Sequence, residues 1–91
     1  MQLPSQVQLH QNYPNPFNPT TRIEFSIPET SHVTLEVFNI QGQRVATLVN
    51  GTRDAGVHTV SFDAANLASG VYMYRIQAGN FTRVNKMMLV K

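Results

Sequence analysis

The chain has 91 residues and a mass of 10.2 kDa, with 42% hydrophobic residues, no cysteine and no tryptophan. This length suits one domain, and the hydrophobic content is typical of a folded chain rather than a disordered one. The absence of cysteine excludes a disulfide framework, thiolate zinc ligands and a cysteine nucleophile. A chain of this size can form one sandwich or bundle, but not a catalytic cleft between two domains.

Charged residues are few and scattered. They make up 13% of the chain, and seven Lys/Arg against five Asp/Glu give a formal net charge of +2. Nucleic-acid binding needs a clustered basic stripe, so we expect no nucleic-acid partner. No run approaches the roughly 20 apolar residues of a membrane helix, so we expect no membrane insertion. The N-terminus lacks the basic start and apolar block of a signal peptide, so any export signal is expected to belong to a larger protein or to have been cut away.

Residues 1–12 are polar and glutamine-rich, and they predict a linker or disordered lead before a domain that spans residues 13–91. The next segment holds three prolines in six positions, Pro14, Pro16 and Pro19. Each proline fixes its own φ and favours extended geometry in the residue before it, so this segment is stiff and not helical. Two roles stay open. The segment is either a rigid lead-in with Phe17 plugging one end of the fold, or a recognition element.

From Thr21 onward, apolar residues recur at every second position, which is the period of half-buried strands. The runs cover residues 21–27, 33–40, 44–49, 57–63, 71–78 and 81–90. A change of phase after Val37 predicts either a bulge or a strand covered on both faces. Residues 64–70 are expected to hold a single helical turn closed by Gly70. Regular short strands separated by turns predict an all-β fold, an immunoglobulin-like antiparallel β-sandwich of about seven short strands without a disulfide.

The final run, which closes the chain, carries apolar residues on both faces. Alternation puts Val84, Met88 and Val90 on one face. Met87 and Leu89 fall on the other face. Such a strand is either central in its sheet or at an edge with one side left for a partner, and we favour the central position.

The sequence offers little for catalysis. Its three histidines, His10, His32 and His58, lie on separate segments without metal-ligand spacing, and His58 is expected to pack at the rim of the fold. We interpret Glu24 and Glu36 as cross-strand neighbours on an outer face, where carboxylates without a cleft do not form a glycosidase site. We therefore expect no enzymatic activity, no cofactor and no metal. Weak calcium binding by the loop residues Asp54, Asp63 and Asn66 stays open, although turn formation explains them better.

Four segments of the sequence carry a resemblance to a known family: LHQNYPNPFNPTTRIEFSIPE, VTLEVFNIQGQRVATLV, AGVHTVSFDAANLASGVYMYRIQAG and KMMLVK. Taken together and in this order, they resemble the type A C-terminal sorting domain of the type IX secretion system. They also resemble the immunoglobulin-like module of flagellar hook-capping proteins, with which that family overlaps. The resemblance runs from about Leu9 to Lys91. It departs at residues 38–39, where members often carry tyrosine-aspartate, and at residues 62–64, where they often carry tryptophan-aspartate-glycine.

This resemblance implies an addressing role. Members stand at the C-terminal end of larger secreted proteins of Gram-negative bacteria and follow Sec-dependent export to the periplasm. The outer-membrane translocon reads the domain and a sortase-like peptidase typically removes it, so that the cargo reaches the outer cell surface or the medium. A chain that begins at Met1 without a signal peptide then looks like an excised domain with a cargo domain before it. By resemblance, the residues tied to translocon recognition are Pro14, Asn15, Pro16, Phe17, Asn18, Pro19, Gly70, Val71, Tyr72, Lys86, Met87, Met88, Leu89, Val90 and Lys91.

Two other functions stay open from the sequence. One is a structural or adhesive immunoglobulin-like spacer of a surface protein. The other is a carbohydrate-binding module that uses Tyr13, Tyr72 or Tyr74 as a stacking platform, although alternation groups Tyr72 and Tyr74 with Ile76 and favours the core for both. Weak homodimerisation through an uncovered sheet edge also stays open.

Overall fold

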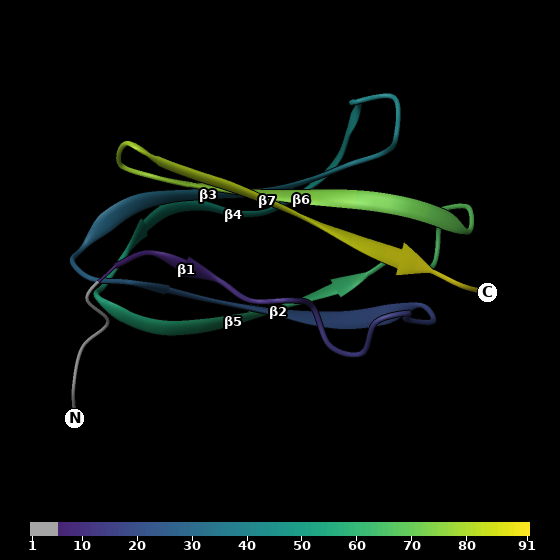
Figure 1. Ribbon diagram of the computed structural model, residues 1–91, viewed down its shortest axis with the longest axis horizontal. Coiled ribbons are helices and arrows are strands. Elements are labelled where there is room, and N and C mark those ends of the chain that lie inside the picture. Colours follow the sequence, from purple (N-terminus) through teal and green to yellow (C-terminus); the bar gives the residue numbers. More distant parts are fainter. Residues whose placement is uncertain (1–5) are drawn as a thin grey trace.

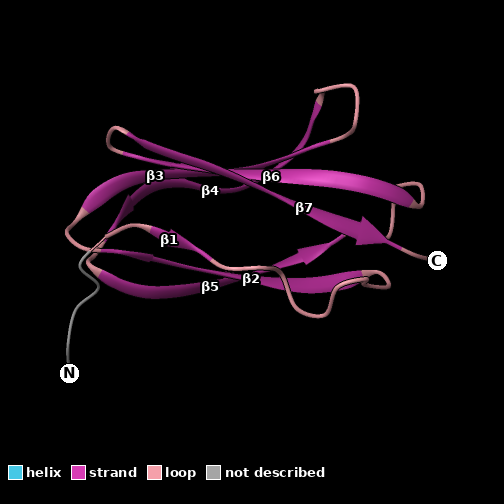
Figure 2. Ribbon diagram, in the orientation of Figure 1, coloured by secondary structure: helices cyan, strands magenta, loops and turns pink. Residues whose placement is uncertain are grey.

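The computed structural model describes residues 6–91, and these form two facing β-sheets (Figure 1). The strands are β1 (Gln8–Leu9), β2 (Thr20–Ile27), β3 (Ser31–Phe38), β4 (Arg44–Arg53), β5 (Gly56–Asp63), β6 (Gly70–Ala78) and β7 (Phe81–Leu89). Loops join them, and residues 6–91 contain no helix (Figure 2). Accordingly, no helix in this part of the chain could cross a membrane.

The three-stranded sheet has the order β1-β2-β5, and the four-stranded sheet has the order β4-β3-β6-β7. Every pair of neighbouring strands is antiparallel. The all-β fold predicted from period-two alternation is therefore confirmed, as a seven-stranded sandwich of the immunoglobulin-like type. The chain contains no cysteine, so no disulfide joins the two sheets.

The core lies between the inner faces of the sheets, where alternate residues of each strand meet. On β2, Ile23, Phe25 and Ile27 are fully buried, as their spacing predicted. From the facing sheet, Tyr74 and Ile76 of β6 are also fully buried. Burial of large apolar side chains from both sheets stabilises the sandwich, at about 1.5–3 kcal/mol for each such side chain.

Strand β3 has two register shifts against β4, one between Leu35 and Glu36 and the other between Val37 and Phe38. The second lies where the alternation changes phase, which agrees with a bulge, the first of the two alternatives that the sequence left open. The helical turn expected over residues 64–70 is wrong. There, the Leu67 N–H donates a 3.0 Å hydrogen bond to the Ala64 carbonyl, which makes a short turn between β5 and β6.

Residues 1–12 are expected to be a linker or disordered lead, and the first five of them lie outside the described part. The described residues of this segment instead belong to the sandwich. Strand β1 pairs with β2, Leu9 is buried at 6% exposure and Asn12 at 2%. The sandwich thus begins before residue 13. The polar run holds two apolar residues at alternate positions, Val7 and Leu9, and two positions are too few to establish a period from which such a short strand can be predicted.

Strand β7 is at the edge of the four-stranded sheet, so the favoured interpretation of a buried central strand is wrong. The assignment of its two faces was correct. Met87 and Leu89 are buried in the core, whereas Val84, Met88 and Val90 are 44–51% exposed. An edge strand with apolar residues on its outer face is the second of the two alternatives that the sequence left open.

Candidate recognition surface

Residues 11–17, here called the strap, run along the edge of β7 that does not pair with β6. The Phe17 N–H donates to the Met88 carbonyl at 3.0 Å, and the Val90 N–H donates to the Phe17 carbonyl at 2.9 Å. These bonds make a parallel bridge between Phe17 and Leu89. The strap thus acts as a short additional strand beside the last strand of the fold.

Side chains of the strap make further hydrogen bonds to the backbone of β7. Asn15 Oδ1 accepts a 3.0 Å hydrogen bond from the Met88 N–H, and Gln11 Nε2 donates to the Lys86 carbonyl at 2.7 Å. Backbone groups on one side of a strand recur at every second residue, and these are the outward groups of β7. The edge is therefore occupied from Lys86 to Val90.

The aromatic ring of Phe17 fixes the strap to the sandwich. Its exposure is 2%, and its ring centroid lies 6.2 Å from that of Phe62, with the planes tilted by 55°. The interpretation of Phe17 as a plug for one end of the fold is confirmed. The other residues of the proline segment stay at the surface around this anchor.

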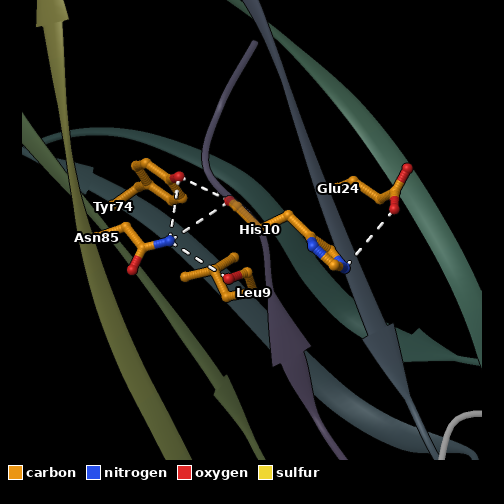
Figure 3. Close-up of polar contacts among 5 residues, drawn as sticks. All are labelled: Leu9, His10, Glu24, Tyr74 and Asn85. Carbon is orange, nitrogen blue, oxygen red and sulfur yellow. Dashed lines mark hydrogen bonds and ion pairs between the residues drawn. The ribbon is translucent and has the colours of Figure 1, made fainter. Parts of the chain in front are cut away.

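The hydroxyl of Tyr74 holds the other end of the strap (Figure 3). It donates to the His10 carbonyl at 2.8 Å, accepts from the Asn12 N–H at 2.9 Å and contacts Asn85 Nδ2 at 3.3 Å. Burial raises the pKa of Tyr74 above its usual 10.0, against the opposing effect of the Asn85 and Asn12 hydrogen bonds. One buried phenol therefore joins β6, β7 and the segment after β1.

Sequence reasoning missed the role of Asn12. Its Nδ2 donates to Thr21 Oγ1 at 3.0 Å and to the Pro14 carbonyl at 3.1 Å, and the Thr21 hydroxyl donates to the same carbonyl at 2.9 Å. Both side chains are buried. They bond the backbone at the start of the proline segment, but a polar residue in a polar run gives no signal of burial.

The residues that the resemblance ties to recognition divide into two groups. The exposed members are Pro14, Asn15, Pro16, Asn18, Gly70, Lys86, Met88, Val90 and Lys91, and the half-buried members are Pro19 and Val71. The buried members are Phe17, Tyr72, Met87 and Leu89. The buried group stabilises the sandwich, and only the exposed and half-buried group is available to a partner.

Three distant segments meet at one hollow of about 200 Å³, which is lined by Asn15, Val71, Lys86, Met87 and Met88. These residues come from the strap, β6 and β7. The last residue, Lys91, is held elsewhere: its ammonium donates to the Ala65 carbonyl at 2.6 Å and its N–H donates to Ser69 Oγ at 3.1 Å. The surface made by the strap, the start of β6 and the end of β7 is here called the strap–β7 surface.

A charged cluster lies on the outer face of the same sheet. Glu36 accepts from Arg44 at 2.9 Å and from Arg75 at 3.0 Å, and the Arg75 guanidinium lies 4.8 Å from the centroid of the Phe38 ring. The hydrogen bond from Arg44 lowers the pKa of Glu36 below 4.5, helped by Arg75 and opposed by burial. Glu24 belongs to the other sheet, so its interpretation as a cross-strand neighbour of Glu36 is wrong.

Within residues 6–91, no three His, Asp or Glu side chains are placed to hold a metal ion. His58 stacks on Phe25 with ring centroids 5.2 Å apart, which is the packed position expected for it. Asp63 Oδ1 accepts the Ala65 N–H at 2.9 Å. This contact is the turn role that was favoured over calcium binding.

The fold and the strap–β7 surface together define a small immunoglobulin-like β-sandwich module whose first and last segments form one face. The family described as secretion system C-terminal sorting domain matches residues 11–91, and the chain belongs to this family. Comparison with curated proteins and with solved structures gives no significant match. The domain is a C-terminal sorting signal for type IX secretion. The family is not catalytic, and its role implies a preceding cargo domain, contact with the type IX machinery and export to the cell surface or medium.

Proposed function

We propose that the outer-membrane translocon of the type IX system recognises this domain through the strap–β7 surface. The cargo, after passage through the periplasm, is thereby directed to the cell surface or medium, and a sortase-like peptidase then removes the domain. The observation that carries the proposal is the hollow at which Asn15, Val71 and Met88 meet. Two motifs at opposite ends of the sequence thus form one feature that a partner can contact.

The occupied edge of β7 favours recognition of side chains over addition of a strand. Strand addition needs free backbone N–H and C=O groups. The Lys86 carbonyl, both backbone groups of Met88 and the Val90 N–H already bond the strap. We therefore infer that the translocon contacts the folded surface and that Lys86 and Met88 supply side-chain contacts.

Deletion of residues 86–91 does not test this proposal well, because it removes Met87 and Leu89 from the core. A sharper test fuses the chain behind a periplasmic reporter in a type IX host and introduces Lys86→Ala with Met88→Ser. We expect the reporter to be retained in the periplasm. The matched control is Arg22→Ala with Val57→Ser, a cationic and an exposed apolar residue on the other sheet. Normal delivery of the Lys86 and Met88 variant would contradict the proposal.

Glycan binding is a second candidate with one supporting observation. Tyr72 and Tyr74 are buried and cannot act as platforms, but Tyr13 is 72% exposed. It lines a hollow of about 270 Å³ together with His10, Arg22 and Glu24. An exposed aromatic ring among polar groups suits a sugar ring. Glycan-array binding that is lost in Tyr13→Ala would support this candidate, and an array without binding would end it.

A further inference from the structure

The outer face of the four-stranded sheet carries an apolar stripe across three strands. Phe38 of β3 pairs with Met73 of β6, and Val71 of β6 pairs with Met88 of β7. Val84 extends the stripe along β7 and is 51% exposed. Apolar side chains gathered on an exposed sheet face are typical of a protein-binding surface.

Two hollows lie in this stripe. The first is the hollow of the strap–β7 surface. The second, of about 240 Å³, is lined by Phe38, Gly42, Met73, Arg75 and Val84. The pair formed by Met73 and Lys86 links the two hollows across β6 and β7. No residue of the second hollow is among those that the resemblance ties to recognition.

The charge on this face is positive. It carries three cations, Arg44, Arg75 and Lys86, whereas Glu36 is the one of the five Asp/Glu side chains that shares it. Three positive charges less one negative leave a surplus of two, which equals the formal net charge of the whole chain. Both arginines already bond Glu36, so no carboxylate of the chain faces Lys86 here. A partner that neutralises this face must be acidic.

We propose that this outer face docks an acidic protein surface of the type IX machinery, which places one apolar side chain in each hollow and carboxylates opposite the three cations. The inference rests on the proposed function and extends it to a second subsite at Phe38, Met73 and Val84. A second copy of the chain does not fit, because two faces with the same surplus charge repel each other. A bilayer fits less well, because concave hollows accept side chains whereas membrane binding relies on protruding apolar groups.

The test measures the affinity of a reporter fused to this chain for the detergent-solubilised type IX translocon. Val84→Asp places a negative charge in the second hollow, and Lys86→Glu reverses the charge between the two hollows. We expect each to weaken binding about tenfold, and Lys86→Glu to reduce the salt dependence of binding as well. Arg53→Glu makes the same charge change at the other end of β4 from Arg44, outside both hollows, and is expected to bind like the wild type. Val84→Ser removes the apolar contact without a new charge, and thermal melting verifies that each variant is folded.

Each possible result supports or overturns a specific part of the proposal. Wild-type affinity in both Val84 variants would overturn the second subsite and leave the strap–β7 surface standing. Equal weakening by Arg53→Glu and Lys86→Glu would show that only the total charge matters, and would overturn the inference. Binding to phosphatidylglycerol vesicles that Lys86→Glu abolishes, with unchanged translocon affinity, would assign the face to a membrane instead. If the wild-type fusion fails to bind the translocon, the proposed function fails and this inference fails with it.

Discussion

The side-chain oxygen of Asn15 accepts a 3.0 Å hydrogen bond from the backbone N–H of Met88, 73 residues further along the chain. It takes the position that a neighbouring strand would occupy in a wider sheet. An edge strand with free backbone groups can pair with other chains, and proteins cover or interrupt such edges. The strap therefore covers the end of β7 as well as shaping the surface beside it.

Loss of the Asn15 side chain should expose this edge. Asn15→Ala leaves the Met88 N–H without its partner, so we expect faster hydrogen exchange at that amide and a loss of about 0.5–1 kcal/mol in the free energy of unfolding. Amide exchange by NMR and urea denaturation measure the two effects. Asn18→Ala is the control, since Asn18 makes no side-chain hydrogen bond among the described residues. Equal exchange rates at Met88 in both variants would contradict the role of Asn15.

Phe17 should contribute more to the free energy of unfolding than the exposed residues around it. Phe17→Ala removes a ring that is 2% exposed and packs against Phe62, and we expect the free energy of unfolding to fall by about 3–5 kcal/mol. Tyr13→Ala, at a side chain that is 72% exposed, should change it by less than about 0.5 kcal/mol. Chemical denaturation compares them. Similar losses in the two variants would mean that Phe17 is not the anchor of the strap.

The hydroxyl of Tyr74 should contribute stability out of proportion to its size. Tyr74→Phe leaves the Asn12 N–H and the His10 carbonyl without their bonds to the phenol, which should cost about 1–3 kcal/mol. Tyr13→Phe removes the same atom from an exposed ring and should be nearly neutral. Thermal and urea unfolding test the difference. A neutral Tyr74→Phe would show that water replaces the phenol at this site.

Acid should weaken the Glu36 cluster. The pKa of Glu36 is lowered in the folded chain, so its contribution is present above the unfolded value of 4.5 and is lost as the pH falls from there through the folded value. At about pH 7, Glu36→Gln should lower the free energy of unfolding by about 1–2 kcal/mol, since both arginines are partly exposed. Urea unfolding at about pH 7 and about pH 3 should show the gap between the two proteins closing in acid. A constant gap would contradict the cluster's role.

Alternation was sufficient to predict which residues face the core. Ile23, Phe25 and Ile27 took the buried side of β2, and Met87 and Leu89 took the buried side of β7. Period two reports the two faces of a strand, because successive side chains point in opposite directions. Which face of a strand a residue occupies depends only on its position among its neighbours in the sequence. The sequence alone therefore predicts it well.

The position of a strand within its sheet depends on pairing with distant segments, and the strand's own sequence does not determine it. Apolar residues on both faces of β7 suited a central strand, and only the pairing with β6 and the strap shows an edge. The contacts of Asn12 and Asn15 were equally out of reach, since each joins a short polar residue to a backbone group that alternation does not locate. From the sequence, the candidate site could therefore be assigned only through family resemblance. Which of its residues are buried anchors and which are exposed contacts depends on the three-dimensional fold.

The bridge between Phe17 and Leu89 has a consequence for synthesis. The strap leaves the ribosome before strands β2 to β6, and its partner strand β7 follows them, so the strap cannot close until β7 has emerged. A chain that stops before β7 leaves Phe17 without its seat and β6 with an open edge. The surface beside the strap is thus complete only in a protein whose translation has passed this point, which makes the fold a check on the length of the polypeptide that carries it.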